Sequence, residues 1–126
     1  MDRPAKILVV EDEAVVAMTL KMTLMKKGYD VMPIAMSAET ALTFTAQYHP
    51  HVVLMDIVIR GDKDGIDAAS LITDHYHIPI IYTTAYFDDA TVERAVATAH
   101  VAYLVKPYSD DELFDAIEKA LNGKGH

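Results

Sequence analysis

The chain has 126 residues, no cysteine and a formal net charge of −8, with an isoelectric point near 5.0. This length is typical of one domain that buries its own hydrophobic core, and the absence of cysteine excludes disulfide bonds and thiolate metal sites. The negative charge argues against direct binding to nucleic acid or to anionic membranes, because their phosphate groups would be repelled.

The expected organisation is one domain over residues 1–126, with a core at about 5–121 and a frayed tail or the start of a linker at 122–126. The polar first residues lead directly into a short apolar segment, which favours neither a signal peptide nor a membrane-spanning helix. The predicted location is therefore cytoplasmic.

Short apolar segments alternate with longer helical ones, which is typical of βα units. The expected strands are 6–10, 30–35, 52–56, 79–83 and 102–105. Their nearly continuous apolar character is typical of strands covered by helices on both faces. The sequence therefore predicts an α/β fold with a doubly wound, five-stranded parallel sheet and helices on both faces.

The expected helices are 13–27, 38–48, 65–76, 89–99 and 110–121. Ser37 and Ser109 are suited to cap the helices that follow them, and Gly28 is suited to end the first helix in a left-handed conformation.

The first helix carries two apolar stripes. Ala17, Leu20 and Leu24 are predicted to face the sheet, and a second stripe consists of Val15, Met18, Met22 and Met25. Flexible methionines in an exposed stripe would suit a protein-docking surface.

Four of the five predicted strands end at, or are directly followed by, residues suited to chemistry, most of them polar or charged. They are Glu11-Asp12-Glu13, Asp56, Thr83-Thr84-Ala85 and Lys106-Pro107. The carboxyl ends of parallel strands meet at one edge of a sheet, where ligands bind.

Carboxylates at this edge require a cation, because two like charges about 4 Å apart cost roughly 4 kcal/mol at an effective dielectric of 20. Lys106 is one candidate, and Mg²⁺ is another because it accepts one or two carboxylates and keeps several waters. A metal, a lysine and a hydroxyl donor together would suit phosphoryl transfer to a carboxylate.

These motifs resemble the response regulator receiver family of two-component signalling systems over nearly the whole chain. The residues that carry the resemblance are Val9-Val10-Glu11-Asp12-Glu13, Leu54-Met55-Asp56-Ile57, Asp64-Gly65, Thr84-Ala85 and Tyr103-Leu104-Val105-Lys106-Pro107. The resemblance implies a flavodoxin-like fold with strand order 2-1-3-4-5. It also implies that a sensor histidine kinase or a histidine phosphotransfer domain supplies a phosphoryl group.

The resemblance implies that phosphorylation switches the surface formed by the fourth helix, the fifth strand and the fifth helix. An unknown downstream protein would read this surface, and phosphorylation-dependent homodimerisation is compatible with it. Such a domain catalyses its own phosphorylation and dephosphorylation and is not an enzyme with an external substrate. The first helix would dock the kinase.

The resemblance also implies roles for individual residues. Asp56 would be the phosphoacceptor, and Mg²⁺, or alternatively Mn²⁺, would be bound by Asp12, Asp56, the backbone carbonyl of Val58 and, through a water, Glu11. Most family members carry aspartate at the position of Glu11. The phosphoryl-binding and switch residues would be Thr84, Ala85, Lys106 and Tyr103, with Pro107 after a cis peptide bond and Tyr103 swinging inward after Thr84 moves.

Val58 and Tyr86 each lie two residues beyond a site residue. In this family, polar side chains at these positions help to orient the water that hydrolyses the acyl phosphate, and valine cannot do so. We therefore expect slow self-dephosphorylation.

The alternative function is a degenerate receiver that binds partners without phosphorylation. A dehalogenase-type hydrolase is disfavoured because the second aspartate expected two residues after Asp56 is replaced by Val58. A flavin carrier is disfavoured because the three acidic residues at 11–13 would repel its phosphate. The histidines at 49, 51, 75 and 77 are interpreted as residues near helix ends rather than as metal ligands, and the segment 60–65 as a turn rather than a calcium loop.

Overall fold

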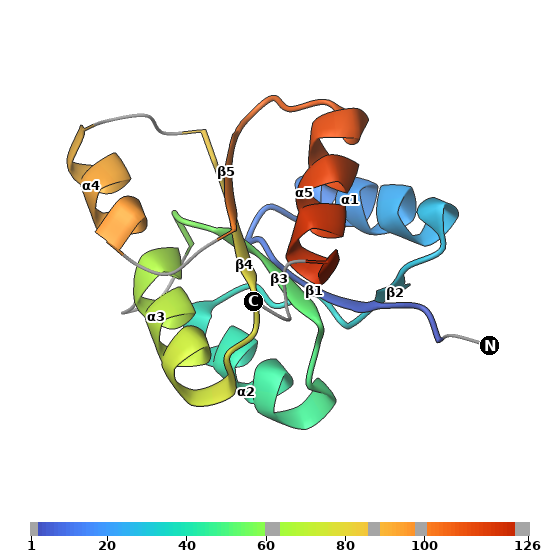
Figure 1. Cartoon of the computed structure of the whole chain (residues 1–126), viewed down its shortest axis with the longest axis horizontal. Helices are drawn as coiled ribbons and strands as arrows, with labels where there is room; N and C mark the ends of the chain where they lie inside the picture. The colour runs from blue at the N-terminus through green and yellow to red at the C-terminus, as the bar shows by residue number, and fades with distance from the viewer. Residues whose placement is uncertain (1–2, 60–63, 86–88, 98–100, 123–126) are drawn as a thin grey trace.

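The structure, a computed structural model, describes residues 3–59, 64–85, 89–97 and 101–122 (Figure 1). Its strands are β1 (Lys6–Val10), β2 (Asp30–Val31), β3 (Val52–Asp56), β4 (Ile80–Thr84) and β5 (Ala102–Val105). All neighbouring strands pair in parallel, in the order β2-β1-β3-β4-β5. The predicted fold class and strand order are confirmed.

In the described part of the chain, four helices connect these strands and a fifth follows β5. They are α1 (Ala14–Lys27), α2 (Ala38–Tyr48), α3 (Gly65–Tyr76), α4 (Asp89–Ala97) and α5 (Asp110–Asn122). In Figure 1, α1 and α5 lie on one side of the sheet, and α2, α3 and α4 lie on the other. Among the described residues, none of these helices has the length and apolar character needed to cross a membrane.

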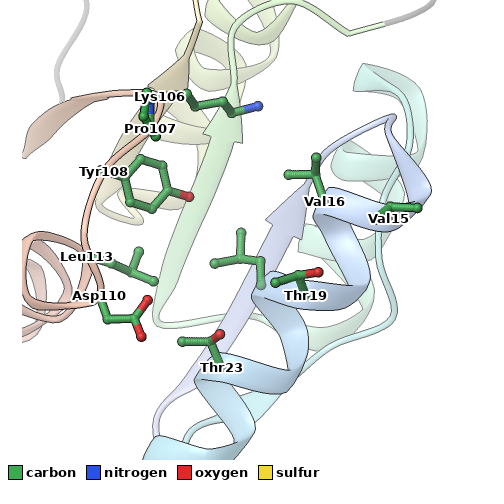
Figure 2. Close-up of a pocket in the computed structure, with 10 residues that line it drawn as sticks. Val15, Val16, Thr19, Thr23, Lys106, Pro107, Tyr108, Asp110 and Leu113 are labelled. Atoms are coloured by element: carbon green, nitrogen blue, oxygen red, sulfur yellow. The ribbon is translucent and has the colours of Figure 1, made fainter.

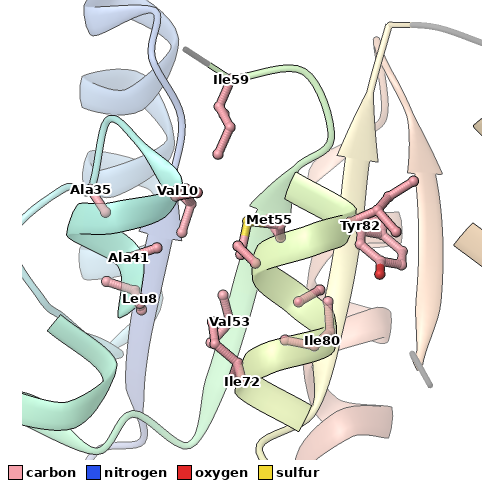
Figure 3. Close-up of a cluster of buried hydrophobic side chains, with 14 of the residues drawn as sticks. Leu8, Val10, Ala35, Ala41, Val53, Met55, Ile59, Ile72, Ile80 and Tyr82 are labelled. Atoms are coloured by element: carbon pink, nitrogen blue, oxygen red, sulfur yellow. The ribbon is translucent and has the colours of Figure 1, made fainter. Parts of the chain in front are cut away.

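The core has two layers because successive side chains of a buried strand point to opposite faces of the sheet. In β3, Val53 and Met55 pack toward α2 and α3 (Figure 3), whereas Val52 and Leu54 pack toward α1 and α5. All five residues of β3 are buried. The strand that carries Asp56 is thus packed against helices on both of its faces.

The second strand is shorter than expected. The predicted strand 30–35 is reduced to Asp30–Val31, with one further bridge between Val10 and Ala35. Pro33 lies in the gap and has no N–H to donate to the sheet. The amides of Met32 and Ala35 still bond to β1, so the segment follows the sheet without forming a continuous strand.

Three other elements differ from the prediction by one residue at one or both ends, and one of them is α5, which ends at Asn122 rather than at residue 121. The fourth strand is Ile80–Thr84 rather than 79–83, since Thr84 pairs with Val105 in β5. The first helix begins at Ala14, with Glu13 as the residue that precedes it. The predicted end of the fourth helix at residue 99 and the tail beyond Asn122 lie outside the described residues.

The predicted helix ends are present. The Ser37 hydroxyl accepts a hydrogen bond from the Thr40 amide, the Ser109 hydroxyl accepts one from the Glu112 amide, and Gly28 has a φ of 104°. His49 and His77 end α2 and α3 with φ of 51° and 57°. This agrees with the interpretation of these two histidines as helix-end residues.

Candidate functional site

Four strand ends bring polar residues together at one edge of the sheet. Asp56 ends β3, Glu11 follows β1, Thr84 ends β4 and Lys106 follows β5. The strand register places Val10 beside Met55, and Asp56 beside Thr83. The topology therefore gathers residues separated by up to 95 positions in the sequence.

Three carboxylates form the acidic part of this site. Glu11, Asp12 and Asp56 each offer an oxygen, and these oxygens all lie within 4.8 Å of one another. Glu11 is 2% exposed and Asp56 is 6% exposed. Clustered carboxylate oxygens suit a hard cation, and a partly hydrated Mg²⁺ needs no more protein ligands than this edge offers. The residues present therefore fit the predicted metal.

Lys106 lies between two of these acids. Its Nζ donates to Glu11 Oε1 at 2.7 Å and to Asp56 Oδ2 at 3.0 Å. Burial acts to lower the pKa of Lys106, but the hydrogen bonds to Glu11 and Asp56 outweigh it and the pKa is raised. The ammonium group therefore stays charged and partly neutralises both carboxylates.

The second carboxylate oxygen of Glu11 also accepts a hydrogen bond. Glu11 Oε2 accepts a hydrogen bond of 3.1 Å from the amide of Glu13, just before α1. Both oxygens of Glu11 thus have protein partners, one from the start of α1 and one from Lys106. This arrangement fixes Glu11 at the rim of the acidic cluster.

The pKa of Asp56 is raised to about 6, chiefly by burial and also by the nearby charge of Glu11, although Lys106 and the Val58 amide act to lower it. The Val58 amide donates to Asp56 Oδ1 at 3.0 Å. Both Asp56 oxygens are therefore oriented, one by Lys106 and one by the backbone. A carboxylate held in this way is suited to act as an oriented nucleophile.

The beginning of α3 presses against the backbone of the same strand end. The Gly65 amide donates to the Ile57 carbonyl at 2.8 Å. A Cβ atom added at Gly65 would overlap the Asp56 carbonyl oxygen. Only glycine permits this close approach without a shift of the backbone.

The predicted switch residues occupy the ends of β4 and β5. Thr84 is fully buried, and its carbonyl accepts a hydrogen bond of 2.8 Å from the Lys106 amide, whereas Ala85 is exposed. Tyr103 is half-buried and its ring meets that of Tyr82 edge-on, with 6.3 Å between ring centres. The peptide bond before Pro107 is cis, as the resemblance implied.

A groove runs beside the site between α1 and the segment that leads into α5 (Figure 2). Its volume is about 390 Å³, and its lining includes Val16, Leu20, Lys106, Pro107 and Tyr108. Lys106 is one of the lining residues and also donates to Asp56 at 3.0 Å, so the groove and the acidic cluster share this residue.

The second stripe of α1 is exposed. The exposed fractions are 79% for Val15, 55% for Met18, 62% for Met22 and 56% for Met25. The residues of the first stripe behave as predicted, since Ala17 and Leu24 are buried and Leu20 is half-buried. The helix therefore presents an uncovered apolar face next to the groove.

The structure brings Glu11, Asp12, Asp56 and Lys106 together, and the backbone of Thr84 contacts that of Lys106; the roles predicted for these residues stay predictions. The amide of Val58 contacts Asp56, and the predicted metal-binding role of its carbonyl remains a prediction. Tyr86 lies outside the described residues. Among the described residues, the acidic cluster is the one group of three or more potential metal ligands, and it contains no histidine.

One feature near the site was not predicted from the sequence. Arg94 of α4 forms ion pairs with Asp64 and Asp67 at the beginning of α3. The residues are 27 to 30 positions apart in the sequence. No local spacing signal could have revealed this contact.

Comparison with known proteins is consistent with this geometry. The model of the response regulator receiver domain family matches residues 7–118. The transcriptional regulatory protein PdtaR of Mycobacterium tuberculosis is 38% identical over 119 residues, which are 94% of this chain and 58% of PdtaR. The chain thus spans less than two thirds of the curated relatives that it matches.

Solved structures show the same similarity. The signal receiver domain of a modulated diguanylate cyclase from Desulfovibrio desulfuricans has a TM-score of 0.92 and 33% identity, with 97% of each chain covered. The N-terminal domain of a response regulator/sensory box/GGDEF protein from Carboxydothermus hydrogenoformans has a TM-score of 0.85 and 31% identity, with 95% of this chain and 96% of that chain covered. Because the family model matches almost the full length, and because the strand-end residues have converged on one site, this chain belongs to the response regulator receiver domain family.

Proposed function

We propose that this receiver domain accepts a phosphoryl group on Asp56 from a sensor histidine kinase or a histidine phosphotransfer domain. The observation that carries the proposal is the oriented Asp56 carboxylate, which has Lys106 at 3.0 Å and two further carboxylates beside it. In the reaction, the P–N bond of the phosphohistidine breaks as an Asp56 oxygen bonds to phosphorus. The leaving imidazole nitrogen takes up a proton.

The surrounding residues would support this step electrostatically. Lys106 would neutralise charge on the transferring phosphoryl oxygens, as a positioned ammonium does in phosphoryl transfer. Thr84 would donate its hydroxyl to a phosphoryl oxygen after a small movement, and Tyr103 would follow it. Ala85 would leave room for the phosphoryl group because its side chain is small.

Asp12 and Asp56, with the Val58 carbonyl and Glu11 through a water, would hold Mg²⁺, for which Mn²⁺ could substitute. The metal would supply charge neutralisation for the phosphoryl oxygens. The fit of the three carboxylates supports this assignment. Glu11 would have to release or share Lys106 while contributing to the metal site, because both of its oxygens are engaged in this structure.

We further propose that the exposed stripe of α1 docks the kinase or the phosphotransfer domain. Its residues Val15, Met18, Met22 and Met25 follow a 3-4-3 spacing, which suits packing against another helix. Lys106 lines the neighbouring groove and contacts Asp56, so a partner bound there would lie close to Asp56. Flexible methionines adapt well to such contacts.

Phosphorylation would change the α4-β5-α5 surface, which a downstream protein would read, with phosphorylation-dependent homodimerisation as one form of output. The names of the similar proteins, a transcriptional regulator and a diguanylate cyclase, suggest that related domains serve different outputs. We place the domain in the cytoplasm, where its proposed donors act. It would catalyse only its own phosphorylation and dephosphorylation.

The direct test is intact mass after incubation with a small phosphodonor such as acetyl phosphate, with Mg²⁺ or with EDTA. We expect one phosphoryl adduct that needs Mg²⁺ and is lost in Asp56→Asn. Asp74→Asn is the matched control, because Asp74 is an exposed carboxylate on α3. A folded wild-type protein that binds Mg²⁺ but gains no phosphoryl group would instead indicate the degenerate receiver.

A further inference from the structure

One arginine of α4 contacts two carboxylates at the beginning of α3. Arg94 donates to both oxygens of Asp64, from Nη1 at 2.7 Å and from Nη2 at 3.2 Å, and Nη2 also reaches Asp67 at 3.4 Å. A two-pronged contact of this kind fixes the direction as well as the distance between the two helices.

The described side chains of α4 bury little apolar surface, since Val92 is half-buried and Ala90 and Ala97 are exposed. Among the described side chains of α4, Ala95 alone is buried, and Figure 1 shows α4 at the outer edge of the fold beside α3. Alanine buries little apolar surface, so it contributes weakly to holding the helix. Arg94 is therefore one of the described contacts that fix the position of α4 against α3.

Arg94 binds the residues at the beginning of α3. The Asp64 side chain accepts a hydrogen bond of 3.0 Å from the Asp67 amide, and the Asp67 side chain accepts one of 3.3 Å from the Asp64 amide. This capping box is reciprocal and fixes the first turn of the helix. Burial alone would raise the pKa of Asp64, but the hydrogen bond and charge of Arg94 outweigh it and keep the pKa low.

The same first turn is pressed against the phosphoacceptor strand. Gly65, which follows Asp64, is so close to the backbone of Asp56 that a side chain would not fit. A continuous series of contacts thus runs from the backbone of Asp56 through Gly65 and Asp64 to Arg94 on α4.

We propose that Arg94 is a latch that holds α4 in the position of the unphosphorylated state and thereby opposes the switch of the α4-β5-α5 surface. The inference rests on the proposed phosphorylation of Asp56. It adds a specific restraint within this chain, located outside the acidic cluster. If α4 changes position on phosphorylation, the contacts of Arg94 must break or be remade, and this requirement stabilises the resting state.

The latch predicts a coupling between Arg94 and the site. Loss of the Arg94 contact, which is made in the unphosphorylated state, should shift the equilibrium toward the phosphorylated-like state. A ligand that binds only the phosphorylated-like state should then bind more tightly. Exposed ion pairs contribute modestly, so we expect about two- to fivefold tighter binding rather than a large change.

The experiment measures binding of beryllofluoride, which mimics an aspartyl phosphate, in saturating Mg²⁺. The variants are Arg94→Met, which removes the latch, Arg94→Lys, which keeps the charge but loses the two-pronged contact, and Asp64→Ser, which keeps an oxygen that can cap α3. Lys119→Met removes the same charge from an exposed position on α5 and is the control. Urea unfolding of each unliganded variant is measured in parallel.

We expect tighter beryllofluoride binding by Arg94→Met and Asp64→Ser, an intermediate effect for Arg94→Lys, and no change for Lys119→Met. Unchanged or weaker binding by Arg94→Met, with or without a loss of stability, would overturn the latch. If the wild type itself failed to bind beryllofluoride, the proposed phosphorylation would fail instead, so the two failures are distinguishable.

Discussion

Replacement of Asp56 by asparagine should change how stability depends on pH. Burial, together with Glu11, raises the pKa of Asp56 from 3.8 to about 6. Between these values the folded state binds more protons than the unfolded state, so the free energy of unfolding falls as the pH rises through this window. At about 1.4 kcal/mol per pKa unit, the full loss is about 3 kcal/mol, reached above pH 6.

Asparagine does not titrate, so Asp56→Asn should avoid this loss. The difference in unfolding free energy between Asp56→Asn and the wild type should therefore grow by up to about 3 kcal/mol between pH 4 and pH 7.5. In Tm this corresponds to roughly 10 °C for a domain of this size. The side-chain ion pair of Lys106 with Glu11 at 2.7 Å should remain in both proteins, so the lysine keeps a partner.

The assay is urea or thermal unfolding in EDTA at several pH values, with Asp74→Asn as the exposed control. The other titratable groups are the same in the wild type and in Asp56→Asn, so their contribution should cancel in the difference. Addition of Mg²⁺ at pH 7.5 should raise the unfolding free energy of the wild type and so reduce its difference from Asp56→Asn. The unfolding free energy of Asp56→Asn itself should change little. A difference that stays constant or shrinks with rising pH would refute the reasoning.

Three further outcomes follow from the site. Gly65→Ala should lower the free energy of unfolding by about 1–3 kcal/mol in urea, because the new Cβ would overlap the Asp56 carbonyl oxygen; unchanged stability would show that α3 can move away freely. Replacing Met18 and Met22 by glutamate should slow transfer from a phosphorylated kinase or phosphotransfer domain while leaving phosphorylation by acetyl phosphate intact, and equal loss of both would contradict docking on α1. Val58→Asn should shorten the half-life of the acyl phosphate, measured by the decay of the phosphoryl adduct, because Val58 is 48% exposed beside Asp56 and valine cannot orient water; an unchanged half-life would exclude this explanation.

The sheet could be predicted because strands buried on both faces leave a clear apolar pattern, as β3 does with all five residues buried. The strand ends could be predicted because Asp56 and Lys106 interrupt that pattern with charge. The carboxyl-terminal end of β2 could not be predicted, because the apolar stretch continues to Ala35 while Pro33 removes a donor from the ladder.

The candidate site was predictable at the level of residues, but not of contacts. The sequence placed Glu11 at the site, but not its hydrogen bonds to Lys106 and to the Glu13 amide, which depend on side-chain length and rotamer. The ion pair between Arg94 and Asp64 was missed because surface arginines rarely signal their partner in sequence. Contacts of this kind arise only after the helices have been placed.

The shortness of β2 also bears on the behaviour of the protein in concentrated solution. β2 is one edge of the sheet, and an edge strand with free backbone groups can recruit a strand from another molecule. Here the strand has two residues, the exposed carboxylate of Asp30 lies within it, and Pro33 follows shortly after. These features leave little regular backbone for edge-to-edge pairing, so this border of the sheet is protected against aggregation by its own irregularity.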